Sequence, residues 1–355
     1  MDEHLFSPGS HQPNTGTFPV GGQRAPGAGS ADGSDVRASG GRGRAGEPRF
    51  DQIVPSGGYL WWYVDAMSDD GQFGLTLIAF VGSVFSPYYA WARRRAGAAA
   101  DPEHHCALNV ALYSRSANRW CMTERGRRHC HRDASEFVVG PSRVHWSGKH
   151  LEIDVNEVGM PIPRRVKGRI RLHPDQLFNF STALDASGRH RWGPLAPSAR
   201  IEVDLESPRQ RWSGHAYLDS NEGDEPIDRG FHHWDWSRSR LRDGSTAVIY
   251  DMQWPQQADH VLSLRFDRQG AVETFQPPPR QTLPRTRWGL KRQMRSPSAV
   301  RVQHQLEDTP FYQRSLLTHE LLGETVQSFH ETLSVPRLVS PIVQSMLPWR
   351  MPRTS

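Results

Sequence analysis

The chain has 355 residues, a formal net charge of +5 and 36% hydrophobic residues. Its three cysteines are too few, and odd in number, for a disulfide framework, which indicates a reducing compartment. The longest apolar run, residues 75–85, is about half as long as a membrane-spanning helix, and the first residues lack the layout of a secretory signal. These features exclude a disulfide-rich secreted scaffold and a helical membrane protein, and we expect a cytoplasmic protein.

Residues 1–49 are rich in Gly, Pro, Ser and Arg and contain almost no aliphatic side chains. Such a segment cannot bury enough apolar surface to offset the entropy lost on ordering. We predict that it is a disordered tail and that the folded part begins at residue 50.

Residues 58–71 predict a strand that is buried on both sides. Trp61 and Tyr63 lie on one face of this strand and Trp62 lies on the other. Asp65 at its end is either the second carboxylate of an acid/base pair or a cap of the following turn.

Residues 86–95 are the best candidate for a helix, because Pro87 follows a serine that can cap the first turn. Elsewhere apolar and polar residues alternate, as in segments 151–156, 201–206 and 262–267, which is typical of strands buried on one face. The sequence therefore predicts an all-β fold of antiparallel strands.

A Pro-rich, weakly patterned segment, residues 188–200, separates two series of strand signals. We place a domain boundary near residue 195. It divides an N-terminal β-domain, residues 50–195, from a C-terminal β-domain, residues 196–353.

Histidines and cysteines gather between residues 104 and 131, but without the CxxC or HxxxH spacing that zinc sites use. They are His104, His105, Cys106, Cys121, His129, Cys130 and His131. Buried thiols and surface histidines are the better interpretation, so no metal is expected. The sequence also has no GxGxxG, P-loop, GxSxG or HExxH motif, which excludes the common nucleotide and hydrolase sites.

The stretch FHHWDWSR, residues 231–238, follows an acidic segment that we interpret as a turn. On a regular strand His232, Trp234 and Trp236 share one face, and His233 and Asp235 share the other. The first face would be an apolar wall with one titratable side chain, suited to an apolar substrate and to stabilising a cation. An aromatic core strand whose histidine bonds to a backbone group remains an equal alternative.

The segment AVIYDMQW, residues 247–254, places Asp251 among apolar neighbours. Desolvation there would raise the pKa of Asp251, as a general acid requires. Tyr250 points to the other side of a regular strand, so both can face one cavity only if a bulge intervenes.

Seven Arg and Lys residues and no carboxylate occur in residues 280–301. This basic segment either prevents pairing at a sheet edge or contacts an anionic lipid surface; nucleic acid is not an expected partner, because no binding motif accompanies the charge. Residues 341–353, with apolar side chains, a tryptophan and arginines, either lie at a membrane interface or pack on the C-terminal β-domain.

Several long words of the sequence match one family in order: GGYLWWYVDAMSDDG (57–71), GRHRWGPLAPSARIEV (188–203), WSGHAYLDSNEGDEPI (212–227) and FHHWDWSR. From about residue 51 to residue 353 the chain resembles the carotenoid 1,2-hydratase (hydroxyneurosporene synthase) family of phototrophic bacteria. The resemblance implies two lipocalin-like β-barrel domains and no redox cofactor. It further implies addition of water to the C1=C2 bond of acyclic carotenes such as neurosporene or lycopene, in spheroidene or spirilloxanthin synthesis at the photosynthetic membrane.

Such a hydration needs a protonated acid, aromatic faces beside a tertiary cation, and a group that orients water. We assign the acid to Asp251, with Asp235 and Asp65 as the next candidates. Cation stabilisation is assigned to Trp234 with Trp236 or Tyr250, and water orientation to His232. Further contacts with the substrate are assigned to His233, Trp236, Trp61 and Tyr63, of which His233 is also the alternative for water orientation. A non-catalytic lipocalin-like carrier of an apolar ligand would need the same aromatic walls but not Asp251, and a related enzyme acting on another polyene is the third hypothesis.

Overall fold

The computed structural model describes residues 46–96, 100–114, 118–254 and 258–354. These described residues belong to one compact unit. The tail predicted for residues 1–49 lies almost entirely outside them.

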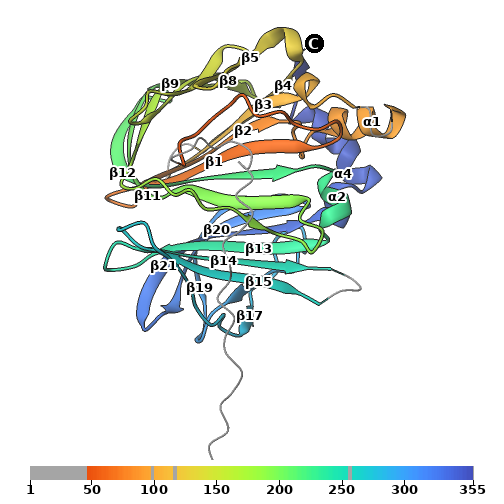
Figure 1. The fold of residues 1–355 in the computed structure, drawn as a ribbon. Coiled ribbons are helices and arrows are strands. Elements are labelled where there is room, and N and C mark those ends of the chain that lie inside the picture. Colours follow the sequence, from red (N-terminus) through yellow and green to blue (C-terminus); the bar gives the residue numbers. More distant parts are fainter. Residues whose placement is uncertain (1–45, 97–99, 115–117, 255–257, 355) are drawn as a thin grey trace, which may run out of the picture. The chain divides into compact units, whose positions relative to one another are not determined.

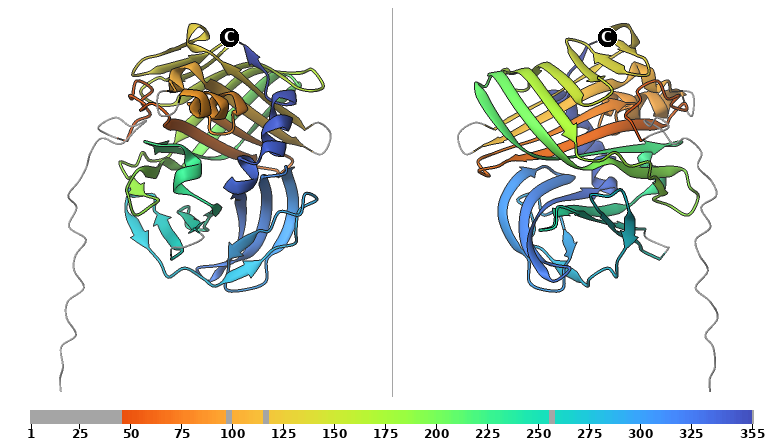
Figure 2. Two further views of the ribbon diagram at one scale, coloured as in Figure 1. Left: turned by 90° about the vertical axis from the view of Figure 1, so that its right-hand side faces the viewer. Right: turned by 60° about the vertical axis from the view of Figure 1, so that its left-hand side comes forward.

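Most of the fold is antiparallel β-structure, as predicted (Figure 1). The first sheet has the order β22-β4-β3-β2-β1-β12-β11-β9-β8-β7-β6-β5, with β10 paired to β11, and it curls strongly (Figure 2). Its strands are β1 Tyr59–Ser68, β2 Phe73–Val81, β3 Cys106–Ser114, β4 Arg119–Arg125, β5 Cys130–Arg132, β6 Glu136–Val139, β7 Ser142–Trp146, β8 Leu151–Gly159, β9 Arg164–Pro174, β10 Thr182–Ala183, β11 His190–Ser207, β12 Gln210–Gly223 and β22 Arg353–Thr354.

The second sheet has seven strands in the order β16-β15-β14-β13-β21-β20-β19, and β17 and β18 form a separate pair. These strands are β13 His233–Arg240, β14 Thr246–Gln253, β15 His260–Phe266, β16 Val272–Thr274, β17 Arg280–Thr282, β18 Gln293–Arg295, β19 Arg301–Asp308, β20 Tyr312–Leu321 and β21 Glu324–Ser334.

Short helices gather at one end of the sheets (Figure 1). They are α1 Pro87–Ala96, α2 Ile227–Gly230, α3 Val335–Leu338 and α4 Pro341–Met346, with 3₁₀ turns η2 Pro102–His104, η3 Arg127–His129 and η4 Leu347–Trp349. Helix α1 confirms the predicted helix, since Ser86 Oγ accepts a hydrogen bond from the backbone N–H of Tyr89. No helix in the described ranges is long and apolar enough to cross a membrane.

Strand β1 is buried on both faces, as its sequence predicted. Leu60 and Trp62 point into a core that fills the curled first sheet. Trp61 and Tyr63 point into a second core, which also contains Trp236 from the second sheet. Alternation along β1 therefore supplies one core inside the first sheet and another between the two sheets.

The chain passes from the first sheet to the second between β12 and β13, through α2. Residue 195 lies inside β11, which pairs with β12 along most of its length. The change of sheet thus falls nearly thirty residues after the predicted boundary, because the Pro-rich segment extends a strand instead of linking two units. The division into two domains stays a prediction.

Candidate functional site

An inner cavity of about 40 Å³ lies between the two sheets, within the second core. Side chains from both sheets line it: Trp61, Tyr63, Ile78, Phe80, Phe85, Asp219, Asn221, Trp234, Trp236, Tyr250, Tyr312 and Glu331. Nine of these twelve side chains are aromatic or aliphatic, and the other three are Asp219, Asn221 and Glu331. The cavity is therefore an apolar chamber with a few polar groups on its wall.

Aromatic rings from different strands meet around this cavity. The ring centroids of Trp236 and Tyr63 lie 5.6 Å apart in an edge-to-face arrangement, and those of Trp234 and Tyr250 lie 6.0 Å apart, also edge to face. Both tryptophans are on β13, two residues apart, so they share a face as strand parity predicts. Such ring faces can stabilise a positive charge that develops between them.

Asp219 is one of two carboxylic side chains that line the cavity. Strand alternation on β12 turns Asp219 toward the second core with Tyr217, while Leu218 points into the first. Asp219 Oδ2 accepts hydrogen bonds from Trp192 Nε1 at 2.8 Å and from the Tyr217 hydroxyl at 2.9 Å. Burial raises the pKa of Asp219 to about 8 in spite of these two donors. The carboxyl group is therefore protonated at neutral pH.

Two polar atoms on the wall have no hydrogen-bond partner among the described residues: Asn221 Oδ1 and Trp236 Nε1. Asn221 is on the same face of β12 as Asp219, and its amide nitrogen lies 3.5 Å from Asp219 Oδ1. A buried polar atom without a partner lowers stability by about 1–3 kcal/mol. An acceptor and a donor on one cavity wall therefore form a suitable binding site for a water molecule.

Glu331 forms the second acidic group of the wall, and it is held in place by two donors. Its Oε1 accepts a hydrogen bond from the Tyr63 hydroxyl at 2.6 Å and from Arg314 Nε at 2.8 Å. Arg314 is fully buried and also pairs with Glu307 at 2.8 Å. Glu331 is thus paired with a guanidinium, whereas Asp219 has only neutral donors.

The sequence-predicted acid, Asp251, lies elsewhere. It pairs with Asp235 in regular register on the face of the second sheet that points away from the inner cavity, where Arg280 Nε and Arg295 Nε donate to it at 2.8 and 2.7 Å. Burial raises the pKa of Asp251, but the two arginines more than offset this and the pKa lies below its ordinary value. The expected rise was wrong because both arginines come from the later β17–β18 hairpin.

The predicted histidine positions also differ from the structure. Strand β13 begins at His233, so His232 precedes the strand and is exposed. His233 is partly buried, with Nε2 3.5 Å from Asp235 Oδ2 on the face opposite to Trp234. Asp65 lies inside β1 instead of capping a turn, and Arg238 Nε donates to it at 2.8 Å.

Sequence reasoning missed Asp219, Asn221 and Glu331. The stretch from residue 218 was interpreted as an acidic turn, but β12 continues to Gly223. The alternation of Tyr217, Asp219 and Asn221 was the signal that could have identified them.

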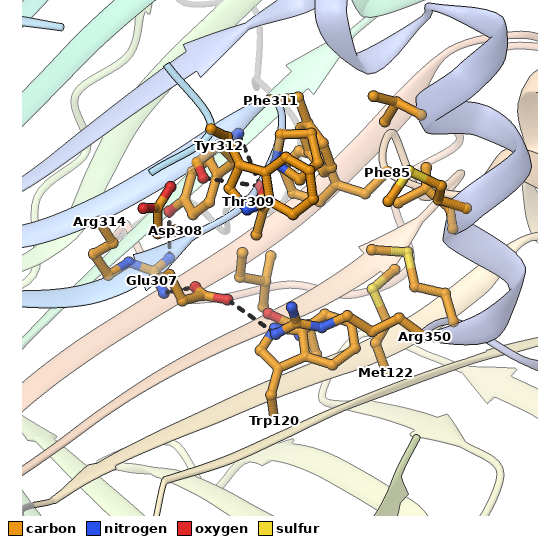
Figure 3. Close-up of a pocket in the computed structure, with 18 residues that line it drawn as sticks. Phe85, Trp120, Met122, Glu307, Asp308, Thr309, Phe311, Tyr312, Arg314 and Arg350 are labelled. Atoms are coloured by element: carbon orange, nitrogen blue, oxygen red, sulfur yellow. Dashed lines mark hydrogen bonds and ion pairs between the residues drawn. The ribbon is translucent and has the colours of Figure 1, made fainter. Parts of the chain in front are cut away.

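A larger outer cavity of about 240 Å³ adjoins the inner one and shares Ile78, Phe85 and Tyr312 with it. Figure 3 shows its wall, in which apolar rings and thioethers face a polar edge formed by Glu307 and Arg314. Further lining residues are Asn109, Trp120, Met122, Trp288, Asp308, Thr309, Pro310, Phe311, Val343, Met346, Leu347, Arg350 and Met351. The two cavities are thus neighbours, and Asp219 lies on the wall of the inner one.

The described part of the chain brings together no group of three or more His, Cys, Asp or Glu side chains suited to holding a metal ion. Cys106 and Cys121 are buried free thiols, and Cys130 is a partly buried one.

The chain is similar to known proteins over most of its length. The family model described as carotenoid hydratase CrtC matches residues 77–355. A protein of Rubrivivax gelatinosus named acyclic carotenoid 1,2-hydratase is 62% identical over 344 residues, which cover 96% of this chain and 85% of the relative. A protein of Thiocapsa roseopersicina with the same name is 50% identical over 99% of this chain and 87% of its own length.

Among solved structures, a Nitrosomonas europaea protein assigned as AttH superimposes with a TM-score of 0.57 at 13% identity, covering 78% of this chain and 92% of the other. This match supports the fold alone. The family model and the two relatives establish the family as well, because their matches extend over most of the chain. The family model covers every residue of the inner cavity from Ile78 onward. The chain belongs to the carotenoid hydratase family.

Proposed function

We propose that this chain is an acyclic carotenoid 1,2-hydratase whose reaction takes place in the inner cavity. The relatives at 62% and 50% identity support the activity. The observation that supports the location is a buried carboxylic acid with a pKa of about 8 on the wall of an aromatic cavity.

Addition of water to an isolated trisubstituted alkene begins with a proton. Protonation at C2 breaks the π bond and leaves a tertiary cation at C1, and the oxygen of a water molecule then bonds to C1. The resulting oxonium loses one proton, so the net change is addition of one water molecule and no electron is transferred. The chemistry requires no redox cofactor.

Asp219 is the proposed proton donor, because it is protonated at neutral pH and no cation is paired with it in the described structure. After donation its carboxylate is stabilised by the hydrogen bonds from Trp192 and Tyr217. The same two donors therefore lower the energy of the state that follows proton transfer.

Trp234, Trp236 and Tyr250 supply the ring faces for the tertiary cation. Asn221 Oδ1 and Trp236 Nε1 are proposed to hold the attacking water. Since Asn221 is next to Asp219, the proton released by the oxonium returns to the Asp219 carboxylate, and the cycle closes without a second acid.

Incubation with lycopene or neurosporene in H₂¹⁸O tests the function. We expect ¹⁸O in the 1-hydroxy group of the extracted pigment, measured by mass spectrometry. Pigment that is bound but carries no ¹⁸O would instead favour the non-catalytic carrier, which the aromatic walls alone would also permit.

Hydration is expected to fall as the pH rises through about 8, since Asp219 must carry its proton to act as an acid. The pKa of Asp219 is higher in the folded than in the unfolded protein. Its contribution to the free energy of unfolding is therefore fully present below its ordinary pKa, and it is lost as the pH rises through about 8. The pH profile of kcat measures the loss of hydration, and the free energy of unfolding as a function of pH measures the loss of stability. A kcat that stays constant from about pH 6 to pH 10 would contradict the assignment.

Asp251 remains the sequence-based candidate for the acid, and His232 the candidate for water orientation. In the structure neither lines the inner or the outer cavity. Peripheral association with the inner or photosynthetic membrane is also part of the proposal, because an acyclic C40 hydrocarbon partitions into lipid.

A further inference from the structure

Exposed large apolar side chains gather at the mouth of the outer cavity. Ile342 is 74% exposed, Trp349 76%, Trp288 50% and Met346 41%. Trp288 and Met346 line the cavity itself, while Ile342 and Trp349 adjoin its lining residues in sequence. We call these four residues the rim.

Neighbouring residues of the rim are capped, buried or hydrogen-bonded in the fold, which holds the rim in place. Ser340 caps α4, and Val343 and Leu347 on the inner side of α4 and η4 are buried in the second core. Residues on the outer side of the same helical segment, such as Ile342 and Met346, are consequently turned outward.

Trp288 is fixed from the other side of the mouth, since Arg337 donates to the carbonyl oxygens of Trp288 and Gly289. Exposed large apolar side chains held in place beside a cavity usually mark an interaction site.

Several basic side chains lie near the rim residues in space or in sequence. Arg94 and Arg95 end α1, and Arg94 reaches the carbonyl oxygen of Val339 just before α4. Arg287 and Lys291, on either side of Trp288 in sequence, are exposed as well. In the left view of Figure 2 the C-terminal helices, in blue, run beside α1 where the two sheets meet. Exposed apolar and aromatic groups with cations nearby complement an anionic lipid surface.

The cavities behind the rim are small. Their volumes are about 240 and 40 Å³, whereas sites that enclose a drug-sized ligand commonly measure about 300–1,000 Å³. A C40 hydrocarbon is longer than such ligands, so only one end of it can enter. The rest must stay in an apolar medium outside the mouth.

We propose that the rim is a docking surface for an anionic lipid bilayer and that the outer cavity is the port through which one end of the carotenoid passes from the lipid to Asp219. The inference rests on the proposed function and adds the entry route. Since one end enters at a time, the two ends of a symmetric carotene are hydrated in separate binding events.

The double variant Ile342→Ser/Trp349→Ser tests the docking surface, because neither residue lines a cavity. Ile162→Ser is the matched control: Ile162 is 65% exposed in the turn between β8 and β9. Co-sedimentation is measured with vesicles of phosphatidylcholine and phosphatidylglycerol and with vesicles of phosphatidylcholine alone. Turnover of lycopene is measured in the mixed vesicles and in detergent micelles.

We expect the wild type and Ile162→Ser to bind the mixed vesicles, and the double variant to bind about tenfold or more weakly. The double variant should hydrate lycopene at the wild-type rate in micelles and slowly in vesicles. Equal vesicle binding by all three proteins, or a loss limited to Ile162→Ser, would overturn the docking surface. Absence of hydration by the wild type in micelles would count against the hydratase function itself, which separates the two failures.

Discussion

Replacing Asp219 by Asn is expected to lower kcat for hydration by about 10²- to 10⁴-fold, the range that a general acid contributes. An amide has nearly the same shape and can still accept hydrogen bonds from Trp192 and Tyr217, but it cannot deliver a proton to C2. The measurement is single-turnover formation of 1-hydroxy product in detergent micelles. Binding of the carotene, followed by its absorption spectrum, should change little.

Asp251→Asn is the matched control, since it makes the same chemical change at the sequence-predicted acid. It leaves Arg280 and Arg295 with a weaker partner, so we expect reduced stability and turnover within a few-fold of the wild type. The reverse outcome, loss of turnover with Asp251→Asn and its retention with Asp219→Asn, would move the acid to Asp251 and to the opposite face of the second sheet.

Replacing Arg238 by Met is expected to lower the free energy of unfolding by about 3–5 kcal/mol, because it leaves the Asp65 carboxylate buried without its cation. Both side chains are almost fully buried and join the first sheet to the second. The Arg238 guanidinium also lies over the ring of Phe329, 4.9 Å from its centroid. Urea denaturation followed by tryptophan fluorescence measures the change.

The double variant Asp65→Asn/Arg238→Met serves as the control for this ion pair. With the carboxylate removed as well, most of the lost stability should return, since the desolvation cost of two charges largely offsets their attraction. If the double variant were as unstable as the two single variants combined, the loss would arise from packing around Phe329 and not from the unpaired charge.

Much of the architecture could be predicted from local patterns. Alternation in segments such as 151–156 predicts half-buried strands, because burial on a sheet has a period of two, and β8 and β9 have it in the structure. The two aromatic faces of β1 likewise predicted a strand between two cores. These features depend only on residues that are neighbours along the chain.

The candidate site depended on contacts between distant residues. Asp251 has apolar neighbours along β14, but Arg280 and Arg295, 29 and 44 residues later, decide its protonation. Asp219 has polar neighbours along the chain, and only the packing of the second sheet against the first buries it. Strand β13 begins at His233, so His232 lies before the strand and not on the face to which it was assigned. The environment that sets a pKa is therefore not readable from the adjacent sequence.

The last strand, β22, pairs in parallel with β4 at the edge of the first sheet. There Arg353 forms an ion pair with the buried Glu124. During synthesis on the ribosome β3 and β4 emerge more than two hundred residues before this partner, so β4 is an open edge and Glu124 lacks its cation for most of translation. Completion of the first sheet, at the edge strand that carries Trp120 and Met122, can therefore follow only after residues 353–354 have left the exit tunnel.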